Sequence, residues 1–177
     1  MMLSVYPIST VPCRIGELAM KIAEAKAKVE QWLTEEGFKV ADDPHPDCAF
    51  RLSADDGQGR SVSILQRPGR IDQVEVGVNV ELESTETAKI SKMQPSERME
   101  LLWNLRFQLI NLGVGFQGPE LPLRAITIET VVYYDGLTKH EFIHRVALVR
   151  RAMVATVWTL NRYLKEPPRS LGFQLPR

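Results

Sequence analysis

One short stretch of the chain contains the residue types and the spacing of a catalytic motif. His140-Glu141-Phe142-Ile143-His144 matches the His-Glu-x-x-His pattern of zinc proteases. Side chains four positions apart share one face of a helix, so both imidazoles could bind the same zinc ion. Glu141 would then be the general base that activates a zinc-bound water. The spacing therefore makes a zinc-dependent hydrolase one candidate function.

The surroundings of these histidines argue against a metal site. Thr138 and Glu141 form the Thr-x-x-Glu pattern of a helix capping box, which already gives the glutamate a structural role. The face with both histidines continues with Arg151 and Arg162, so it is expected to be solvated and cationic. Glu166 would lie roughly 33 Å away along the same helix, too far for a third ligand. We therefore interpret His140 and His144 as incidental surface residues and expect no catalytic residue, metal or cofactor.

The composition is typical of a soluble globular domain. The chain has 177 residues, of which 44% are hydrophobic and 25% are charged. Its formal net charge is +0, which argues against nucleic-acid binding because phosphate contacts need a basic excess. Bases dominate after residue 139 and acids dominate between residues 72 and 100. We interpret Arg145, Arg150, Arg151 and Arg162 as a solvated helix face, and a nucleic-acid-binding accessory protein is the second alternative function.

Neither the cysteines nor the apolar segments indicate a secreted or membrane protein. Cys13 and Cys48 have neither metal-site nor disulfide-framework spacing. The first ten residues lack the basic start and apolar run of a signal peptide. No apolar run approaches the roughly 20 residues of a membrane span. We expect a soluble cytoplasmic protein with no membrane partner.

The hydrophobic pattern predicts a single α+β domain over residues 17–166, with an irregular lead-in at 1–16 and a tail at 167–177. Strict alternation from Val74 to Leu82 indicates a strand with one buried and one solvated face. Short turns between strands indicate an antiparallel sheet. The predicted order is α-β-β-β-α-β-β-α, with helices near 17–36, 95–112 and 139–164, strands near 48–52, 62–64, 74–82, 114–117 and 123–134, and a polar connection at 84–94.

The second predicted helix has too much apolar surface for a single packed face. Its apolar residues cover roughly 240° of the helix, against the ~100° that packing on one surface requires. Only one polar strip interrupts them: Glu97, Glu100, Asn104, Gln108 and Asn111. A contiguous second apolar surface is typical of a binding site or of an oligomer contact. We therefore predict a two-fold homodimer whose interface includes Leu101, Leu105, Leu109 and Leu112.

Three local patterns resemble an archaeal family of unknown function: Trp32-Leu33-x-x-Glu36-Gly37-Phe38, Leu102-Trp103-Asn104-Leu105-Arg106 and Asp135-Gly136-Leu137-Thr138-Lys139. That family has a type III secretion chaperone-like fold, and the layout is similar to the bacterial YbjN-type family. The resemblance spans residues 20–164 and implies a small α+β unit that dimerises. It implies no catalytic residues. The predicted function is a non-enzymatic, homodimeric, chaperone-like module that binds an unknown client protein.

Overall fold

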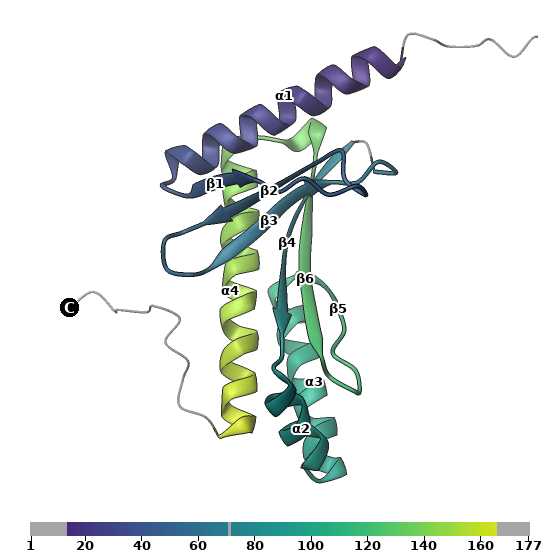
Figure 1. Cartoon of the computed structure of the whole chain (residues 1–177), viewed down its shortest axis with the longest axis vertical. Coiled ribbons are helices and arrows are strands. Elements are labelled where there is room, and N and C mark those ends of the chain that lie inside the picture. The colour runs from purple at the N-terminus through teal and green to yellow at the C-terminus, as the bar shows by residue number, and fades with distance from the viewer. Residues whose placement is uncertain (1–13, 71, 166–177) are drawn as a thin grey trace, which may run out of the picture.

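The computed structural model describes residues 14–70 and 72–165, with side chains from residue 21 onward. This part of the chain folds into four α-helices and one six-stranded antiparallel sheet (Figure 1), so the predicted α+β class is confirmed. The elements are α1 (Arg14–Glu35), β1 (Lys39–Asp42), β2 (Phe50–Asp55), β3 (Ser61–Gln66), β4 (Gln73–Glu81), α2 (Ser84–Lys92), α3 (Pro95–Leu112), β5 (Gly115–Gln117), β6 (Ala125–Tyr133), a 3-10 turn (Tyr134–Gly136) and α4 (Lys139–Leu164).

The sheet has the strand order β1-β2-β3-β4-β6-β5, and α4 runs along one of its faces (Figure 1). In β6 the side chains alternate, so that Ile126, Ile128 and Val132 are buried under the helices. In β4, Val74 and Val76 face the same way and are fully buried. The opposite face of the sheet carries mostly polar side chains, as the alternation predicts.

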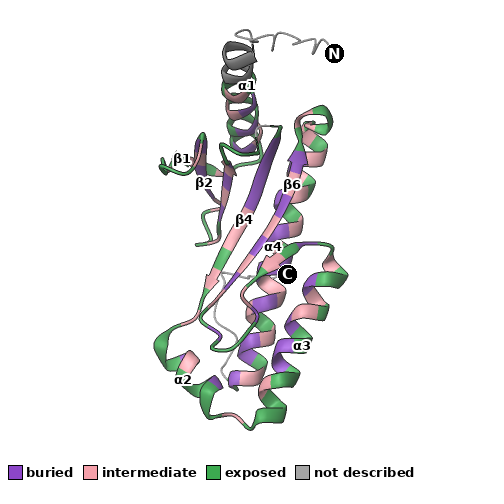
Figure 2. Cartoon of the chain, turned by 90° about the vertical axis from the view of Figure 1, so that its right-hand side faces the viewer, coloured by how far each residue is buried: buried purple, intermediate pink, exposed green. Residues whose placement is uncertain are grey.

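Two hydrophobic clusters share α4. The first contains α1, β2, β3 and the N-terminal half of α4, where Phe142 lies with its ring centroid 6.0 Å from that of Trp32. The second contains α3, β6 and the C-terminal half of α4, including Leu160 and Leu164. Figure 2 shows α3 and α4 side by side at the second cluster. α4 therefore fixes α1 at one end of the molecule and α3 at the other.

Two elements and one boundary differ from those predicted from the sequence. β1 is a four-residue edge strand that pairs with β2, too short to show a period. α2 lies in the predicted polar connection; Glu83 and Glu86 form its capping box, and Ile90 is its single buried apolar residue. α1 begins at Arg14, so the predicted lead-in at 1–16 is wrong over its last three residues. Residues 1–13 and the predicted tail lie outside the described residues.

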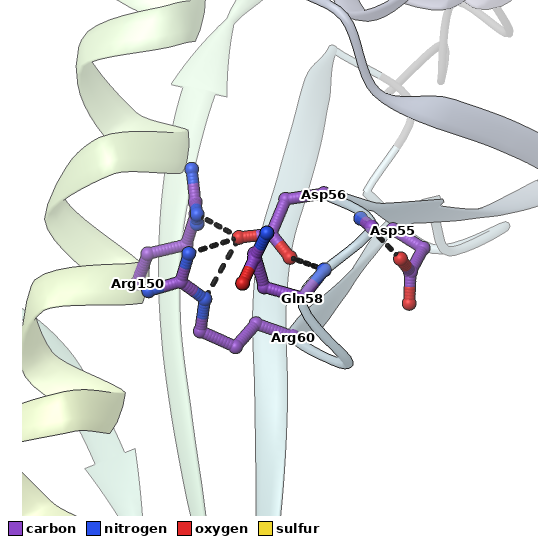
Figure 3. A network of polar contacts seen from close by, with 6 residues as sticks. Asp55, Asp56, Gln58, Arg60 and Arg150 are labelled. Atoms are coloured by element: carbon purple, nitrogen blue, oxygen red, sulfur yellow. Dashed lines mark hydrogen bonds and ion pairs between the residues drawn. The ribbon is translucent and has the colours of Figure 1, made fainter. Parts of the chain in front are cut away.

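A largely buried carboxylate, that of Asp56, connects the β2–β3 turn to α4 (Figure 3). Oδ2 of Asp56 accepts a 2.8 Å hydrogen bond from Nε of Arg60 and contacts the guanidinium of Arg150. Its Oδ1 accepts from the backbone N–H of Gln58 at 2.8 Å. Burial raises the pKa of Asp56, but these hydrogen bonds and the Arg150 charge outweigh it and hold the pKa below its ordinary value. The charged residues of this turn therefore contribute to the packing of the sheet against α4.

Candidate protein-binding surface

Sequence signals at both ends of α3 determine where this helix begins and ends. Pro95 occupies the first helical position, and the side chains and backbones of Gln94 and Glu97 form a reciprocal capping box. Gly113 ends the helix with φ 70°, a left-handed conformation that glycine adopts without steric strain. The helix therefore spans 95–112, as the sequence predicts.

The leucines of α3 face the protein's own core. Leu101, Leu105 and Leu109 have no exposed surface, and they pack in the second cluster with Ile126 and Ile128 of β6. The prediction that these leucines form an intermolecular interface is wrong, because β6 and α4 of the same chain cover that flank. Leu112 is half-buried at the edge of the same cluster. The second apolar flank of the helix must therefore consist of other residues.

Three residues of the polar strip of α3 form hydrogen bonds with α4: Glu100, Asn104 and Gln108. Tyr163 of α4 donates a 2.9 Å hydrogen bond to Glu100 and accepts one from Asn104 at 2.5 Å. The Thr159 hydroxyl donates to Gln108 at 2.8 Å. These bonds fix the rotation of α3 about its axis. They leave a third surface of the helix turned away from both the sheet and α4.

That third surface is an exposed apolar stripe, which we call the α3 stripe: Met99, Trp103, Phe107 and Ile110. Between 46% and 58% of the surface of each residue is exposed. Spacings of four, four and three residues place all four side chains on one helical face. An exposed apolar surface of this kind on a soluble protein is typical of a site that binds another molecule.

The aromatic part of the α3 stripe is ordered within the chain. The rings of Trp103 and Phe107 are stacked, with centroids 5.5 Å apart. The guanidinium of Arg106 lies 5.4 Å from the Trp103 centroid, and its Nε donates to the carbonyl of Pro119 at 3.0 Å. Stacked aromatic rings beside an anchored arginine match the composition of protein interface centres. The stripe is thus a preorganised surface.

His140 and His144 lie in the first turns of α4 on an exposed surface shared with Glu36, Lys139 and Ile143. The Glu141 carboxylate accepts a 2.6 Å hydrogen bond from Nε of Arg145. The Glu141 backbone N–H donates to the Thr138 hydroxyl at 3.3 Å. Within residues 14–70 and 72–165, no group of three or more His, Cys, Asp or Glu side chains could hold a metal ion. The histidine pair therefore has no third ligand among the described residues.

The capping box at Thr138 is half formed. The Thr138 side chain accepts from the Glu141 N–H, but the Thr138 N–H donates to the carbonyl of Gly136 at 2.9 Å. Because the Glu141 carboxylate is held by Arg145, it does not close the reciprocal half of the box.

Three basic residues of α4 have acidic partners within the fold. Lys139 contacts Glu35 and Glu36 of α1, each at 2.9 Å, and these hydrogen bonds raise its pKa. Arg145 and Arg150 are paired with Glu141 and Asp56, as described above. Pairing within the chain takes these three cations out of the set that could contact a phosphate backbone, and it leaves Arg151 and Arg162 as exposed cations of this helix. No helix in the described ranges is long and apolar enough to cross a membrane.

The comparisons with known proteins agree with the fold and supply no activity. A crystal structure of an uncharacterized protein from the archaeon Methanothermobacter thermautotrophicus is similar, with a TM-score of 0.71 and 26% sequence identity. The similarity covers 79% of this chain and 99% of that chain. No curated protein matches. The family model described as an uncharacterized conserved protein (DUF2299) matches residues 25–160, and the chain therefore belongs to this family.

Proposed function

We propose that the protein is a non-enzymatic protein-binding module that works as a homodimer, with the α3 stripe as the contact between subunits. The observation that carries the proposal is the stripe itself, four large apolar side chains that the chain's own fold leaves half exposed. The resemblance to the secretion chaperone-like fold supports the same function, because such units dimerise.

The order of residues along the stripe favours a second copy as its occupant. The midpoint between Met99 and Ile110 and the midpoint between Trp103 and Phe107 both fall at residues 104–105. An antiparallel copy of α3 would therefore place Met99 opposite the partner's Ile110 and Trp103 opposite the partner's Phe107. A two-fold axis requires such a self-complementary surface.

The surroundings of the stripe suit the same arrangement. Glu100 and Asn104 lie on the flank next to α4, so an apolar centre has a polar rim. α3 packs on the side of the sheet that α4 covers. Pairing through α3 would thus leave the opposite face of the sheet free for a client segment.

Sedimentation velocity at micromolar concentration tests the homodimer. The wild type should sediment as a dimer, and Trp103→Glu should sediment as a monomer, because a charge in the contact would lose its hydration. Trp158→Glu is the matched control: Trp158 of α4 is 54% exposed against 47% for Trp103. A monomeric wild type, or equal dissociation by both substitutions, would contradict the proposal.

A chaperone-like role also requires binding to an incompletely folded client. The dimer should slow the aggregation of a reduced, unfolded protein, measured by light scattering at substoichiometric and equimolar ratios. An unchanged aggregation rate at an equimolar ratio of dimer to client would contradict the chaperone-like role. The proposed homodimer would not be affected by that result.

A further inference from the structure

The face of the sheet opposite α4 contains a hollow of about 220 Å³. Strands β2, β3, β4 and β6 form its floor, and the loop with His45, Asp47 and Cys48 forms part of its rim. The hollow is smaller than the roughly 300–1,000 Å³ of sites for drug-sized ligands. Its size suits a single functional group on a short alkyl chain.

One row of cross-strand neighbours consists mostly of residues with small or no side chains, and this row leaves space above the sheet. The register pairs Ser63 with Gly77, Gly77 with Glu129, and Glu129 with Gly115. A glycine therefore lies on each side of the only long side chain in this row. A Cβ on Gly77 would lie 3.7 Å from Cβ of Glu129, and one on Gly115 would lie 3.3 Å from its Cγ. The two glycines give the Glu129 side chain the space that other residues would take.

Glu129 is a carboxylate without a direct ion pair in this space. Among the described residues it makes no hydrogen bond and no ion pair, although it is half-buried and lines the hollow. A charged group of this kind usually has a partner.

A second acceptor in the same hollow is also incompletely used. Glu75 is 4% exposed, and its Oε2 accepts from Nε of Arg67 at 2.9 Å. Its Oε1 is buried and accepts no hydrogen bond from the described residues, and its one ion pair, with Nη1 of Arg70, is long at 3.8 Å. A buried carboxylate oxygen without a donor is rare in folded proteins.

The charges that line the hollow leave a negative excess. Arg67 is held by Glu75, and Arg51 is paired with Asp43 at 3.0 Å. Arg67 also interacts electrostatically with Glu129 but forms its ion pair with Glu75. The acids that line the hollow outnumber the arginines by three to two: Asp47, Glu75 and Glu129 against Arg51 and Arg67. The acceptors that remain need a ligand that donates several hydrogen bonds and carries positive charge, which an ammonium or a guanidinium does.

We propose that this hollow binds an alkylammonium or alkylguanidinium group, with Glu129 as its counterion and Glu75 Oε1 as a further acceptor. The group could come from a lysine or arginine side chain of a bound polypeptide or from a small free amine, since both present the same chemistry. The site is independent of pairing through α3, because it lies on the opposite face of the sheet.

Two-dimensional NMR of the ¹⁵N-labelled protein tests the site, with the amides of Gly77 and Gly115 as local reporters. The probes are n-butylammonium, the capped tripeptide Ac-Gly-Arg-Gly-NH₂ and its counterpart Ac-Gly-Glu-Gly-NH₂. We expect saturable shifts of both amides with the two cationic probes and none with the acidic peptide. Tighter binding of the arginine peptide identifies a polypeptide source, and tighter binding of the amine identifies a free one.

Variants decide whether Glu129 is the counterion. Glu129→Gln keeps the side chain's shape and should weaken cation binding at least tenfold. Glu120→Gln removes an exposed carboxylate elsewhere and should leave binding unchanged. Gly115→Ala keeps every charge but fills space beside Glu129, so it should also weaken binding, read at Gly77. No saturable shift with either cationic probe, or equal binding by wild type and a folded Glu129→Gln protein, would overturn the proposal.

Discussion

α3 and α4 pack side by side over the same sheet, yet they use their outward surfaces differently. Three cations of α4, Lys139, Arg145 and Arg150, have acidic partners within the chain, and Arg150 on Asp56 is the most buried of these pairs. The outward face of α3 is the apolar stripe, whose aromatic rings contact each other and Arg106. Contacts within the chain therefore account for these three cations of α4, whereas they leave the α3 stripe about half exposed. The difference makes α3, rather than α4, the candidate binding surface.

The largest expected effect separates the two apolar flanks of α3. Leu105→Ala should lower the free energy of unfolding by about 3 kcal/mol, because it leaves a cavity in the second cluster. Phe107→Ala removes a side chain that is 56% exposed, so it should cost the monomer less than about 0.5 kcal/mol. Denaturant unfolding at several protein concentrations measures both values.

Concentration dependence separates folding from association in this experiment. The cost of Leu105→Ala should be the same at every protein concentration, whereas any cost of Phe107→Ala should vanish on dilution. Equal and concentration-independent losses would show that the stripe belongs to the core, and the contrast between the helices would disappear.

The next effect concerns the polar contacts of α4. Asp56→Asn should lower stability at pH 7 by about 2 kcal/mol, because Arg60 and Arg150 lose a charged acceptor. The pKa of Asp56 is lowered by folding, so its contribution is present above the unfolded pKa and is lost as pH falls through the folded pKa. The difference between wild type and variant should therefore shrink below about pH 4. Thermal unfolding from pH 7 to pH 3 measures it.

Asp55→Asn is the neighbouring control for this turn. Among the described residues, the Asp55 side chain accepts a single local hydrogen bond, from the N–H of Gly57, and it does not reach α4. Its substitution should cost less than Asp56→Asn at pH 7. If the two variants behaved alike, the link between the turn and α4 would contribute little to the fold.

Sequence signals located both helices but not the flank of α3 that stays exposed. Pro95, Gly113 and Thr138 are local signals, so the ends of α3 and the start of α4 could be predicted. Whether Leu105 or Phe107 faces β6 depends on how the helix crosses the sheet, which periodicity does not determine. The aromatic composition of one flank was the available signal, because leucines favour cores and aromatic residues are enriched at interfaces.

The hollow in the sheet could not be predicted from the sequence. It depends on the register that brings Gly77 and Gly115 to either side of Glu129, and these residues are far apart in the sequence. β1 and α2 were missed for a simpler reason. Each buries too few apolar residues to produce a period, and pairing or capping holds each in place.

A smaller effect is expected where α4 begins. Thr138→Ala should lower stability by about 1 kcal/mol, because the Glu141 N–H loses its acceptor. Thr138→Ser keeps the hydroxyl and should restore most of the loss. An unchanged melting temperature in the alanine variant would show that water replaces the cap.

The smallest effect probes the contact between the two helices. Tyr163→Phe removes the hydroxyl that joins Glu100 and Asn104, and it should cost about 0.5 kcal/mol because these groups can reach water. Burial and the hydrogen bond to Glu100 raise the pKa of Tyr163. Its contribution should be constant up to about pH 10 and be lost as pH rises through the folded pKa. Denaturant midpoints between pH 7 and pH 11 measure this.

Tyr133→Phe controls for the loss of a hydroxyl, because Tyr133 is 53% exposed and its hydroxyl makes no hydrogen bond among the described residues. Tyr163→Phe should leave sedimentation unchanged, since its hydroxyl contacts the polar strip and not the α3 stripe. If Tyr163→Phe instead dissociated the protein, the rotation of α3 set by α4 would control the interface. The two helices would then form one functional unit, and the division between a folding surface on α4 and a binding surface on α3 would fail.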